Sequence, residues 1–482
     1  MNRKLRTIAM ALCLCFQSNV LAEEVFSVPE GTNRIWISIN GDFEQILKDS
    51  HNQKFDTFKD TEIKVNDSAG YKGEQVKGLT TRGQTCLKAP RRCLGIKLSE
   101  KITFRLSNAQ SVATKNFSLS SMWQDLGYAN SNLGYSILAQ AGLFPIRHLY
   151  AEVLIKDSSS NGKYLSKGLY LITENPDKAL GDDKGVAAPY VLRRGYRSEQ
   201  FGDIKLPGGL PDVSGAKVEV YKKELENEKI NNPFSETAYS KAYQEIYTAG
   251  VYKKSGVALY EELSQRMDID AYLKWLAINS FLKNGDYTDE VYFYADAQKA
   301  VKEGKIYFRI MGWDYDGLFA EPHLKLLVKS KAGLEILKDI LGIGGGGESD
   351  RLKSHGIPIK VLDQTLLYSA EDNLDLKIGV DAYLYKKYLE TLRTVVSVDL
   401  SDAKVRALAE KIYQELFPYL NSPAILAQSQ RDDLPNGYKN GYTKENIRRR
   451  LDEIVQLLAT RRSEILRQSQ TGGERSRPVR VN

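Results

Sequence analysis

Apolar residues recur at a helical period in the middle of this 482-residue chain. From Ile269 to Phe281 they repeat about every 3.6 positions, and Asp268 or Asp270 can cap the start of the helix that this pattern predicts. Asn284-Gly285 supplies residues that commonly end a helix. The pattern therefore predicts a helix that ends just before Asp286.

Two short aromatic segments follow this helix with the period of a strand. Val291 to Ala295 and Ile306 to Ile310 alternate as half-buried strands do, and the segment between them is a charged linker. They predict the two strands of a hairpin. Asp286 then precedes the first strand, whereas Asp314 and Asp316 lie where the second strand stops. The predicted order is helix, acidic loop, hairpin and acidic turn.

The rest of the chain divides into a β-rich part and a helical part. Residues 23–230 predict mainly strands with one helix, and residues 231–470 predict mainly helices. The expected fold class is α+β. The tail, residues 471–482, has the composition of a disordered segment. The elements expected outside the central segment are strands at Ile35–Ile39, Ile102–Leu106, Leu149–Ile155 and Gly168–Thr173, and helices at residues 129–143, 405–416 and 447–465.

The acidic residues around the hairpin allow two interpretations. Mg²⁺ prefers carboxylate and phosphate oxygens, and a hairpin is a stiff way to bring two acidic loops together. Alternatively, Asp286 and Asp289 are ordinary turn residues, and Trp313 to Gly317 is a polar turn. The spacing alone leaves both interpretations open.

Two acidic motifs and four upstream segments follow one another in a fixed order. The acidic motifs are NGDYTDEVYFY, from Asn284, and GWDYDGLF, from Gly312. The upstream segments are TRGQT from Thr81, APRRCLGIKL from Ala89, NFSLSSMWQDLGYANSNLGYSILAQAGLF from Asn116, and KGLYLITE ending at Glu174. In this order they resemble the CotH kinase family, atypical kinases named after a spore-coat protein, over about half of the chain.

The resemblance implies an atypical protein-kinase-like fold, with a β-rich N-terminal lobe and a mainly helical C-terminal lobe. It also implies transfer of the ATP γ-phosphate to a Ser or Thr hydroxyl of a protein, with Mg²⁺ or Mn²⁺. In this scheme Asp286 is the catalytic residue. Asp314 and Asp316 hold the metal, and Glu290 completes its ligands.

The same resemblance assigns residues to the nucleotide, and here the chain departs from the family pattern. Arg92 or Lys97 would neutralise phosphate charge, and Glu174 would support the adenine side or pair with a basic residue. Arg91-Arg92 stands where the family has a Lys-Lys pair, and arginine does not replace lysine freely in a tight site. Glu290 stands near the position where the family usually has Asn. An inactive pseudokinase is therefore an alternative.

A second function class fits the same acidic residues without nucleotide. Ca²⁺ accepts more oxygen ligands in a looser geometry than Mg²⁺ does, so the cluster would also suit a Ca²⁺-binding scaffold or surface-assembly protein. A hydrolase has less support, because no Gly-x-Ser-x-Gly motif is present. The acidic cluster comprises Asp286, Asp289, Glu290, Asp314 and Asp316.

The N-terminal pattern predicts export. Basic residues within positions 3–6 precede an apolar run, and Val20-Leu21-Ala22 satisfies the small-residue rule for cleavage, so residues 1–22 resemble a secretory signal peptide. No later stretch is long and apolar enough to span a bilayer. We expect a periplasmic or extracellular protein whose substrate belongs to an exported or surface structure. In that compartment Cys86 and Cys93 are expected to form a disulfide.

Charge and glycine content add little to this picture. The formal charge of +7 falls to +4 without the three basic residues of the predicted signal, which is small for this length. A run of glycines from Gly342 to Gly347 lacks the Gly-Lys-Ser/Thr ending of a P-loop and predicts a flexible loop. A basic cluster lies opposite the apolar face of the last helix, and we expect it in water rather than on nucleic acid. It comprises Arg448, Arg449, Arg450, Arg461, Arg462 and Arg467.

Overall fold

The computed structural model separates the chain into two compact units. The described residues up to 123, from 148 to 174 and from 413 to 447 form the first unit, and those at 124–147, 175–412 and from 448 onward form the second. The predicted signal peptide, Asp289, the glycine run and the C-terminal tail lie outside the described residues. The structure describes residues 29–45, 57–58, 61–67, 70–82, 86, 89–105, 111–176, 188, 190–197, 205–206, 210–211, 216–222, 234–287, 290–319, 366–368, 370 and 372–470.

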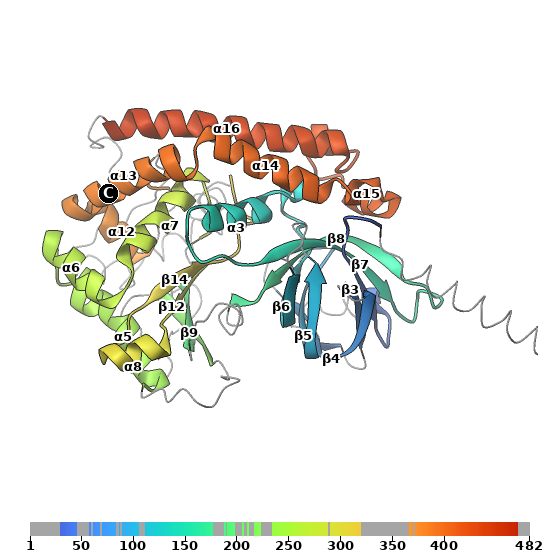
Figure 1. Ribbon diagram of the computed structural model, residues 1–482, viewed down its shortest axis with the longest axis horizontal. Coiled ribbons are helices and arrows are strands. Elements are labelled where there is room, and N and C mark those ends of the chain that lie inside the picture. Colours follow the sequence, from blue (N-terminus) through green and yellow to red (C-terminus); the bar gives the residue numbers. More distant parts are fainter. Residues whose placement is uncertain are drawn as a thin grey trace, which may run out of the picture. The chain divides into compact units, whose positions relative to one another are not determined.

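The first unit contains an eight-stranded sheet, seven strands of which close into a barrel, while β2 pairs with β4 alone (Figure 1). Its strands are β1 Arg34–Ser38, β2 Thr57–Phe58, β3 Glu62–Asp67, β4 Gly70–Arg82, β5 Cys93–Arg105, β6 Ser111–Ser120, β7 His148–Lys156 and β8 Leu165–Glu174. The order β4-β3-β1-β7-β8-β6-β5 returns to β4 because β4 also pairs with β5. Alternate side chains such as Leu94, Ile96 and Leu98 belong to one apolar core cluster, as the period of a strand requires.

The strands expected at Ile35–Ile39, Leu149–Ile155 and Gly168–Thr173 are β1, β7 and β8. The sequence did not indicate that a C-terminal segment also belongs to the barrel unit. Helix α15, Pro423–Ser429, packs on β8. The compact units are therefore discontinuous along the chain and do not follow a single division near residue 230.

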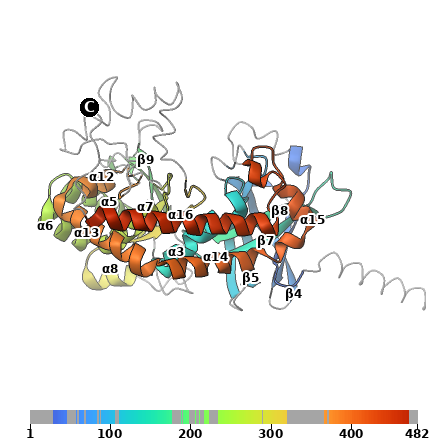
Figure 2. The same ribbon diagram turned by 90° about the horizontal axis from the view of Figure 1, so that it is seen from above.

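The second unit combines helices with a four-stranded sheet in the order β12-β9-β13-β14. Together with the barrel, it makes the chain α+β, as expected. Figure 2 shows α16 as one continuous helix. Among the described helices, none is long and apolar enough to cross a membrane. The elements are α3 Asn130–Gln140, β9 Tyr190–Arg197, β12 Ala216–Lys222, α5 Glu236–Glu245, α6 Gly256–Arg266, α7 Ile269–Phe281, β13 Val291–Tyr294, α8 Ala297–Glu303, β14 Arg309–Gly312, α12 Asn373–Val380, α13 Ala382–Thr394, α14 Asp402–Leu416 and α16 Lys444–Gln470, the last two of which cross the unit boundary.

The central helix and hairpin have the predicted order. The Asp268 carboxylate accepts a hydrogen bond from Ala271 N at 3.0 Å and so caps the start of α7. β13 and β14 pair antiparallel, with Val291 opposite Gly312. The segment between them is not a plain linker, because it forms α8, which Asp296 caps. The pattern of this segment did not predict a helix.

One arginine with no exposed surface, Arg194 on β9, lies in the core of the second unit. It donates to the Tyr272 hydroxyl on α7 at 2.6 Å, and it forms ion pairs with Asp375 at 3.3 Å and Asp372 at 3.5 Å. One guanidinium cannot neutralise two buried carboxylates. Burial, with the nearby Asp372, therefore raises the pKa of Asp375 to about 6 in spite of Arg194. The network ties the sheet to α7 and to the start of α12.

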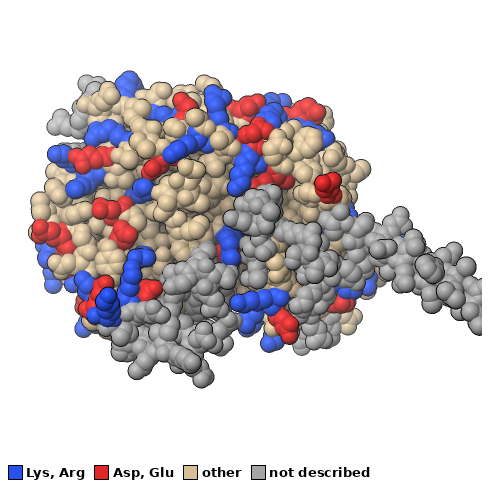
Figure 3. Space-filling view, in the orientation of Figure 1, with Lys and Arg blue, Asp and Glu red and all other residues tan. Residues whose placement is uncertain are grey.

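The basic side of α16 does not lie wholly in water, which corrects the expectation from sequence. Arg461 and Arg462 are only 6% and 7% exposed. Arg461 donates to Ser280 O and Arg462 donates to Val396 O, both at 2.7 Å. The carbonyl at Ser280 lies in the last turn of α7, where it also accepts a hydrogen bond from Lys283 N at 3.3 Å. The helical period could not distinguish these arginines from solvated ones. Elsewhere, basic and acidic side chains are interspersed over the face shown in Figure 3.

Replacing Arg194 by methionine leaves two buried carboxylates without their cation. We expect Arg194→Met to lower the free energy of unfolding by about 3–5 kcal/mol, measured by denaturant unfolding. The control is Arg448→Met on α16, where the arginine side chain is 39% exposed and its partner Glu410 is 49% exposed. For the control we expect a loss of about 1 kcal/mol or less. Equal losses in the two variants would contradict a central role for Arg194.

Candidate functional site

Two acidic loops of the second unit are joined by their backbones. One loop follows α7 and contains Asp286, and the other follows β14 and contains Asp314 and Asp316. Because three backbone hydrogen bonds connect the loops, their carboxylates are held at one end of the hairpin. The bonds run from Gly285 N to Gly317 O at 3.4 Å, from Phe319 N to Leu282 O at 3.2 Å and from Trp313 N to Glu290 O at 2.8 Å.

Asp286 is exposed, but the backbone that carries it is anchored by buried amides. Its N–H donates to Asn284 Oδ1 at 3.1 Å, and Asn284 Nδ2 donates to Asn279 Oδ1 at 2.9 Å. Asn284 and Asn279 have no exposed surface. A Cβ on Gly317 would lie 3.4 Å from the Cβ of Asp286, so the second loop passes directly against Asp286. The sequence predicted Asn284 only as a helix terminator and did not indicate this anchoring role.

Tyr315 separates the two aspartates of the second loop and points into the core. It is 1% exposed, and its hydroxyl accepts a hydrogen bond from Trp275 Nε1 at 3.2 Å. Its ring lies against Gly134 of α3 and Gly312 of β14, where any Cβ would overlap with Tyr315. Asp314 has a φ of +46°, an uncommon conformation for a residue with a side chain. Such strain persists only where the surrounding packing holds it.

The carboxylates of this region are close enough to repel one another. Burial raises the pKa of Asp316 well above its usual value, and the charges of Asp314, Asp125 and Asp286 raise it further. A divalent cation placed among these carboxylates would relieve the repulsion. Asp125, at the start of α3, did not enter the site predicted from sequence. Its sequence position, more than 150 residues before the hairpin, gave no signal of this proximity.

The residues fit a metal that brings some of its own ligands. Among the described residues, no group of three acidic, histidine or cysteine side chains forms a complete metal site. Mg²⁺ usually takes one or two protein carboxylates and completes its shell with phosphate and water. Asp314 and Asp316 suit that role. Glu290, the third predicted ligand, already forms an ion pair with Arg193 at 2.9 Å, so a metal would compete with this arginine for its carboxylate.

The residues predicted to contact the nucleotide belong to the first unit. Lys97 is exposed on β5, whereas Glu174, at the end of β8, is only 5% exposed. Glu174 stands opposite Phe117 of the barrel core, and directly opposed residues in an antiparallel pair share a face. Glu174 therefore faces inward and Lys97 outward. Arg92 is 5% exposed and donates to Cys86 O at 3.4 Å.

Arg91, which stands where the CotH pattern has a lysine, has a structural role. Arg91 is 8% exposed, donates to Ser121 O, and places its guanidinium 5.4 Å from the centre of the Tyr170 ring. It is therefore part of the packing of the barrel unit.

The predicted disulfide between Cys86 and Cys93 is confirmed, with 5.6 Å between the two Cα atoms. It closes the loop that precedes β5.

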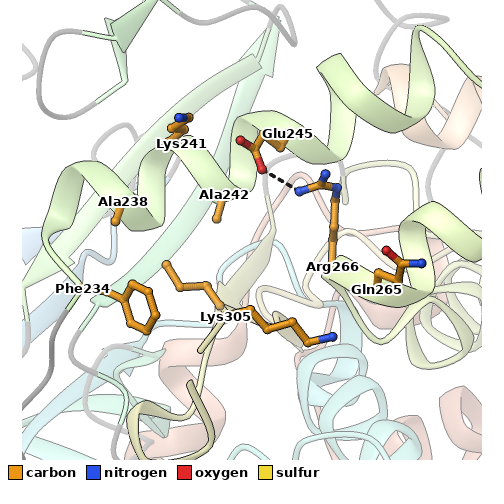
Figure 4. Close-up of a pocket in the computed structure, with 9 residues that line it drawn as sticks. Phe234, Ala238, Lys241, Ala242, Glu245, Gln265, Arg266 and Lys305 are labelled. Atoms are coloured by element: carbon orange, nitrogen blue, oxygen red, sulfur yellow. Dashed lines mark hydrogen bonds and ion pairs between the residues drawn. The ribbon is translucent and has the colours of Figure 1, made fainter. Parts of the chain in front are cut away.

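A separate pocket of about 350 Å³ lies between α5, α6 and the segment before β14 (Figure 4). Arg266 in its wall is paired with Glu245 at 2.6 Å. None of the predicted site residues lines this pocket, so it is distinct from the acidic loops. The lining residues are Phe234, Ala238, Lys241, Ala242, Glu245, Gln265, Arg266, Lys305 and Ile306.

A methyl group on Gly134 tests the packing of the second acidic loop. We expect Gly134→Ala to push Tyr315 away from α3 and to lower the free energy of unfolding by about 1–3 kcal/mol, as overpacked cores do. The control is Gly78→Ala in β4, where the nearest atom to a new Cβ is 3.9 Å away, and we expect little change there. Denaturant unfolding compares the two. A Gly134→Ala protein as stable as wild type would show that Tyr315 is not tightly held.

Comparisons with known proteins identify the family. The family model described as CotH kinase protein matches residues 79–465, which is more than half of the chain. A crystal structure of a Helicobacter pylori proinflammatory kinase, CtkA, aligns over 77% of this chain and 91% of that chain with 10% identity, but at a TM-score of 0.27 this likeness supports no conclusion. The search of curated proteins found no match. On the strength of the family match, this chain belongs to the CotH kinase family.

Proposed function

We propose that this protein transfers the γ-phosphate of ATP to a Ser or Thr hydroxyl of a protein substrate, with Mg²⁺ or Mn²⁺. Membership of the CotH kinase family supports a kinase-like protein. The observation that carries the proposal is the backbone pairing of the Asp286 loop with the Asp314–Asp316 turn at the end of the β13–β14 hairpin. Phosphoryl transfer depends mainly on positioning and on charge stabilisation. Two acidic loops joined by their backbones would supply the positioning and, through a bound divalent cation, the charge stabilisation.

Asp286 is the proposed catalytic residue. Its side chain is exposed and can reach a substrate, while Asn284 fixes the backbone from which it projects. A carboxylate held in this way can orient an acceptor hydroxyl and accept its proton. The contact with Gly317 and the backbone hydrogen bond from Gly285 to Gly317 hold Asp286 against the second acidic loop, which supports this role.

Asp314 and Asp316 are the proposed metal ligands, with Glu290 as a third. A divalent cation bound there would neutralise charge on the β- and γ-phosphates of the nucleotide. The uncommon backbone conformation of Asp314 and the mutual repulsion around Asp316 support this assignment. Arg193 would share the Glu290 carboxylate and reduce its contribution to the metal.

We assign the nucleotide contacts to the barrel unit, which takes the role of an N-terminal lobe, while the second unit takes that of a C-terminal lobe. Lys97 is favoured over Arg92 for the phosphates, because its ammonium is exposed whereas the Arg92 side chain is buried. Glu174 faces the barrel interior, which favours a role in pairing with a buried cation over direct contact with adenine.

We further propose that the protein works after export, in the periplasm or outside the cell, on a protein of an exported or surface structure. The predicted signal peptide and the Cys86–Cys93 disulfide support this location, because structural disulfides persist in oxidising compartments. The second candidate is a non-catalytic Ca²⁺-binding scaffold. The concentration of carboxylates around Asp316 is the observation that favours it.

Isosteric changes at Asp286 and Asp314 test the proposed kinase activity. Purified residues 23–482 are incubated with labelled ATP and Mg²⁺ or Mn²⁺, alone and with an extract of surface proteins. We expect Asp286→Asn to lower kcat by about 10²–10⁴-fold with nucleotide binding retained. We expect Asp314→Asn to lose metal-dependent nucleotide binding as well, because it removes a metal ligand.

The control for both is Glu261→Gln, an exposed carboxylate on α6, which should behave as wild type. The proposed kinase activity would be contradicted if the wild-type protein bound no nucleotide. A melting temperature that rises when Ca²⁺ is added would then favour the Ca²⁺-binding scaffold.

A further inference from the structure

A buried carboxylate that the proposed mechanism does not use lies at the start of α3. Asp125 has no exposed surface. Its Oδ1 accepts a hydrogen bond from Asn130 N at 2.7 Å, and its Oδ2 accepts one from Ser131 N at 2.8 Å. Both donors are backbone groups in the first turn of the helix, which lack partners within the helix. Asp125 therefore fixes where the first turn of α3 lies.

The side chain of Asn130 reaches from this turn to the second acidic loop. Its Nδ2 donates to Asp316 O at 3.3 Å and lies 3.5 Å from Leu318 O, a longer and weaker contact. Asn130 is only 4% exposed, so little water competes for these carbonyl groups. Asn130 thus links two parts of the structure. Its backbone N–H donates to Asp125, and its side chain donates to the acidic turn that contains Asp316.

Arg450 of α16 acts on the same region. Burial raises the pKa of Asp125 to about 6, whereas the hydrogen bonds from Ser131 and Asn130 and the positive charge of Arg450 lower it. Its guanidinium also lies 5.7 Å from the centre of the Phe319 ring, at the end of the acidic turn. The turn is therefore held on one side by the loop after α7 and on the other by α3 and Arg450.

We propose that Asn130, oriented by Asp125, is a positioning residue that directs the carboxylates of Asp314 and Asp316 toward a divalent cation bound with the nucleotide. The inference rests on the proposed function of this turn. Asn130 has no role in binding the metal itself. It fixes the peptide groups from which the ligands project, and outer partners of this kind commonly affect metal affinity about 10- to 100-fold.

Removing the amide of Asn130 tests the proposal. The full mature chain carrying Asn130→Ala is titrated with Mn²⁺ in the presence of a non-hydrolysable ATP analogue, and bound Mn²⁺ is followed by electron paramagnetic resonance. We expect the apparent Kd for Mn²⁺ to rise about ten-fold or more. In turnover assays the Mg²⁺ concentration for half-maximal rate should rise similarly, while kcat at saturating Mg²⁺ recovers toward the wild-type value.

The matched control is Asn132→Ala on the same helix. Asn132 is 1% exposed, and its Oδ1 accepts a hydrogen bond from Ser136 Oγ at 3.0 Å within α3. The same truncation at this position should lower the melting temperature about as much as Asn130→Ala does. It should leave the Mn²⁺ affinity within about two-fold of wild type, because the hydrogen bond between Asn132 and Ser136 stays within α3 and does not orient a metal ligand.

Two outcomes would overturn the inference, and they are distinguishable. Equal Mn²⁺ affinities in Asn130→Ala and Asn132→Ala, with wild type binding normally, would refute the positioning role alone. A wild-type protein that binds no Mn²⁺ with the nucleotide analogue would refute the proposed function, and the inference with it.

Discussion

The packing of Tyr315 against two glycines is the contact on which the candidate site depends. Gly134 of α3 and Gly312 of β14 leave room for the ring, and a side chain at either position would overlap with it. Because Tyr315 points into the core, Asp314 and Asp316 flank an anchored residue. The strained backbone of Asp314 is then held by packing, and the acidic turn can lie directly against Asp286.

Further support for the site comes from polar groups buried within the second unit. Arg194 binds Tyr272 of α7, and α7 in turn carries Asn279, which anchors Asn284 and thus the loop of Asp286. Asp125 and Asn130 do the same for the second acidic loop. Buried hydrogen-bond networks of this kind rigidify a core. The two acidic loops are therefore positioned by residues that lie outside the set of predicted site residues.

Local pattern predicted the local parts of this arrangement. The period of α7, its Asp268 cap and the first strand of the hairpin are properties of adjacent residues, and they were predicted correctly from sequence. The second strand was predicted at Ile306–Ile310, whereas β14 lies at Arg309–Gly312. The contact between Asn130 and Asp316 joins residues 186 positions apart, and no periodicity reports such a contact. The buried arginines of α16 were misjudged for the same reason, since their partners lie on α7 and near residue 396. The predicted roles of Asp286, Asp314, Asp316, Glu290, Arg92, Lys97 and Glu174 came from the family resemblance and remain predictions.

Amide hydrogen exchange with and without Mg²⁺ and a non-hydrolysable ATP analogue tests the central claim most directly. The account predicts that the nucleotide and metal together slow exchange in the two acidic loops, at residues 284–290 and 313–319, and that the analogue without metal does so less. No protection in these loops would contradict it. So would protection confined to the pocket lined by Lys241, Arg266 and Lys305.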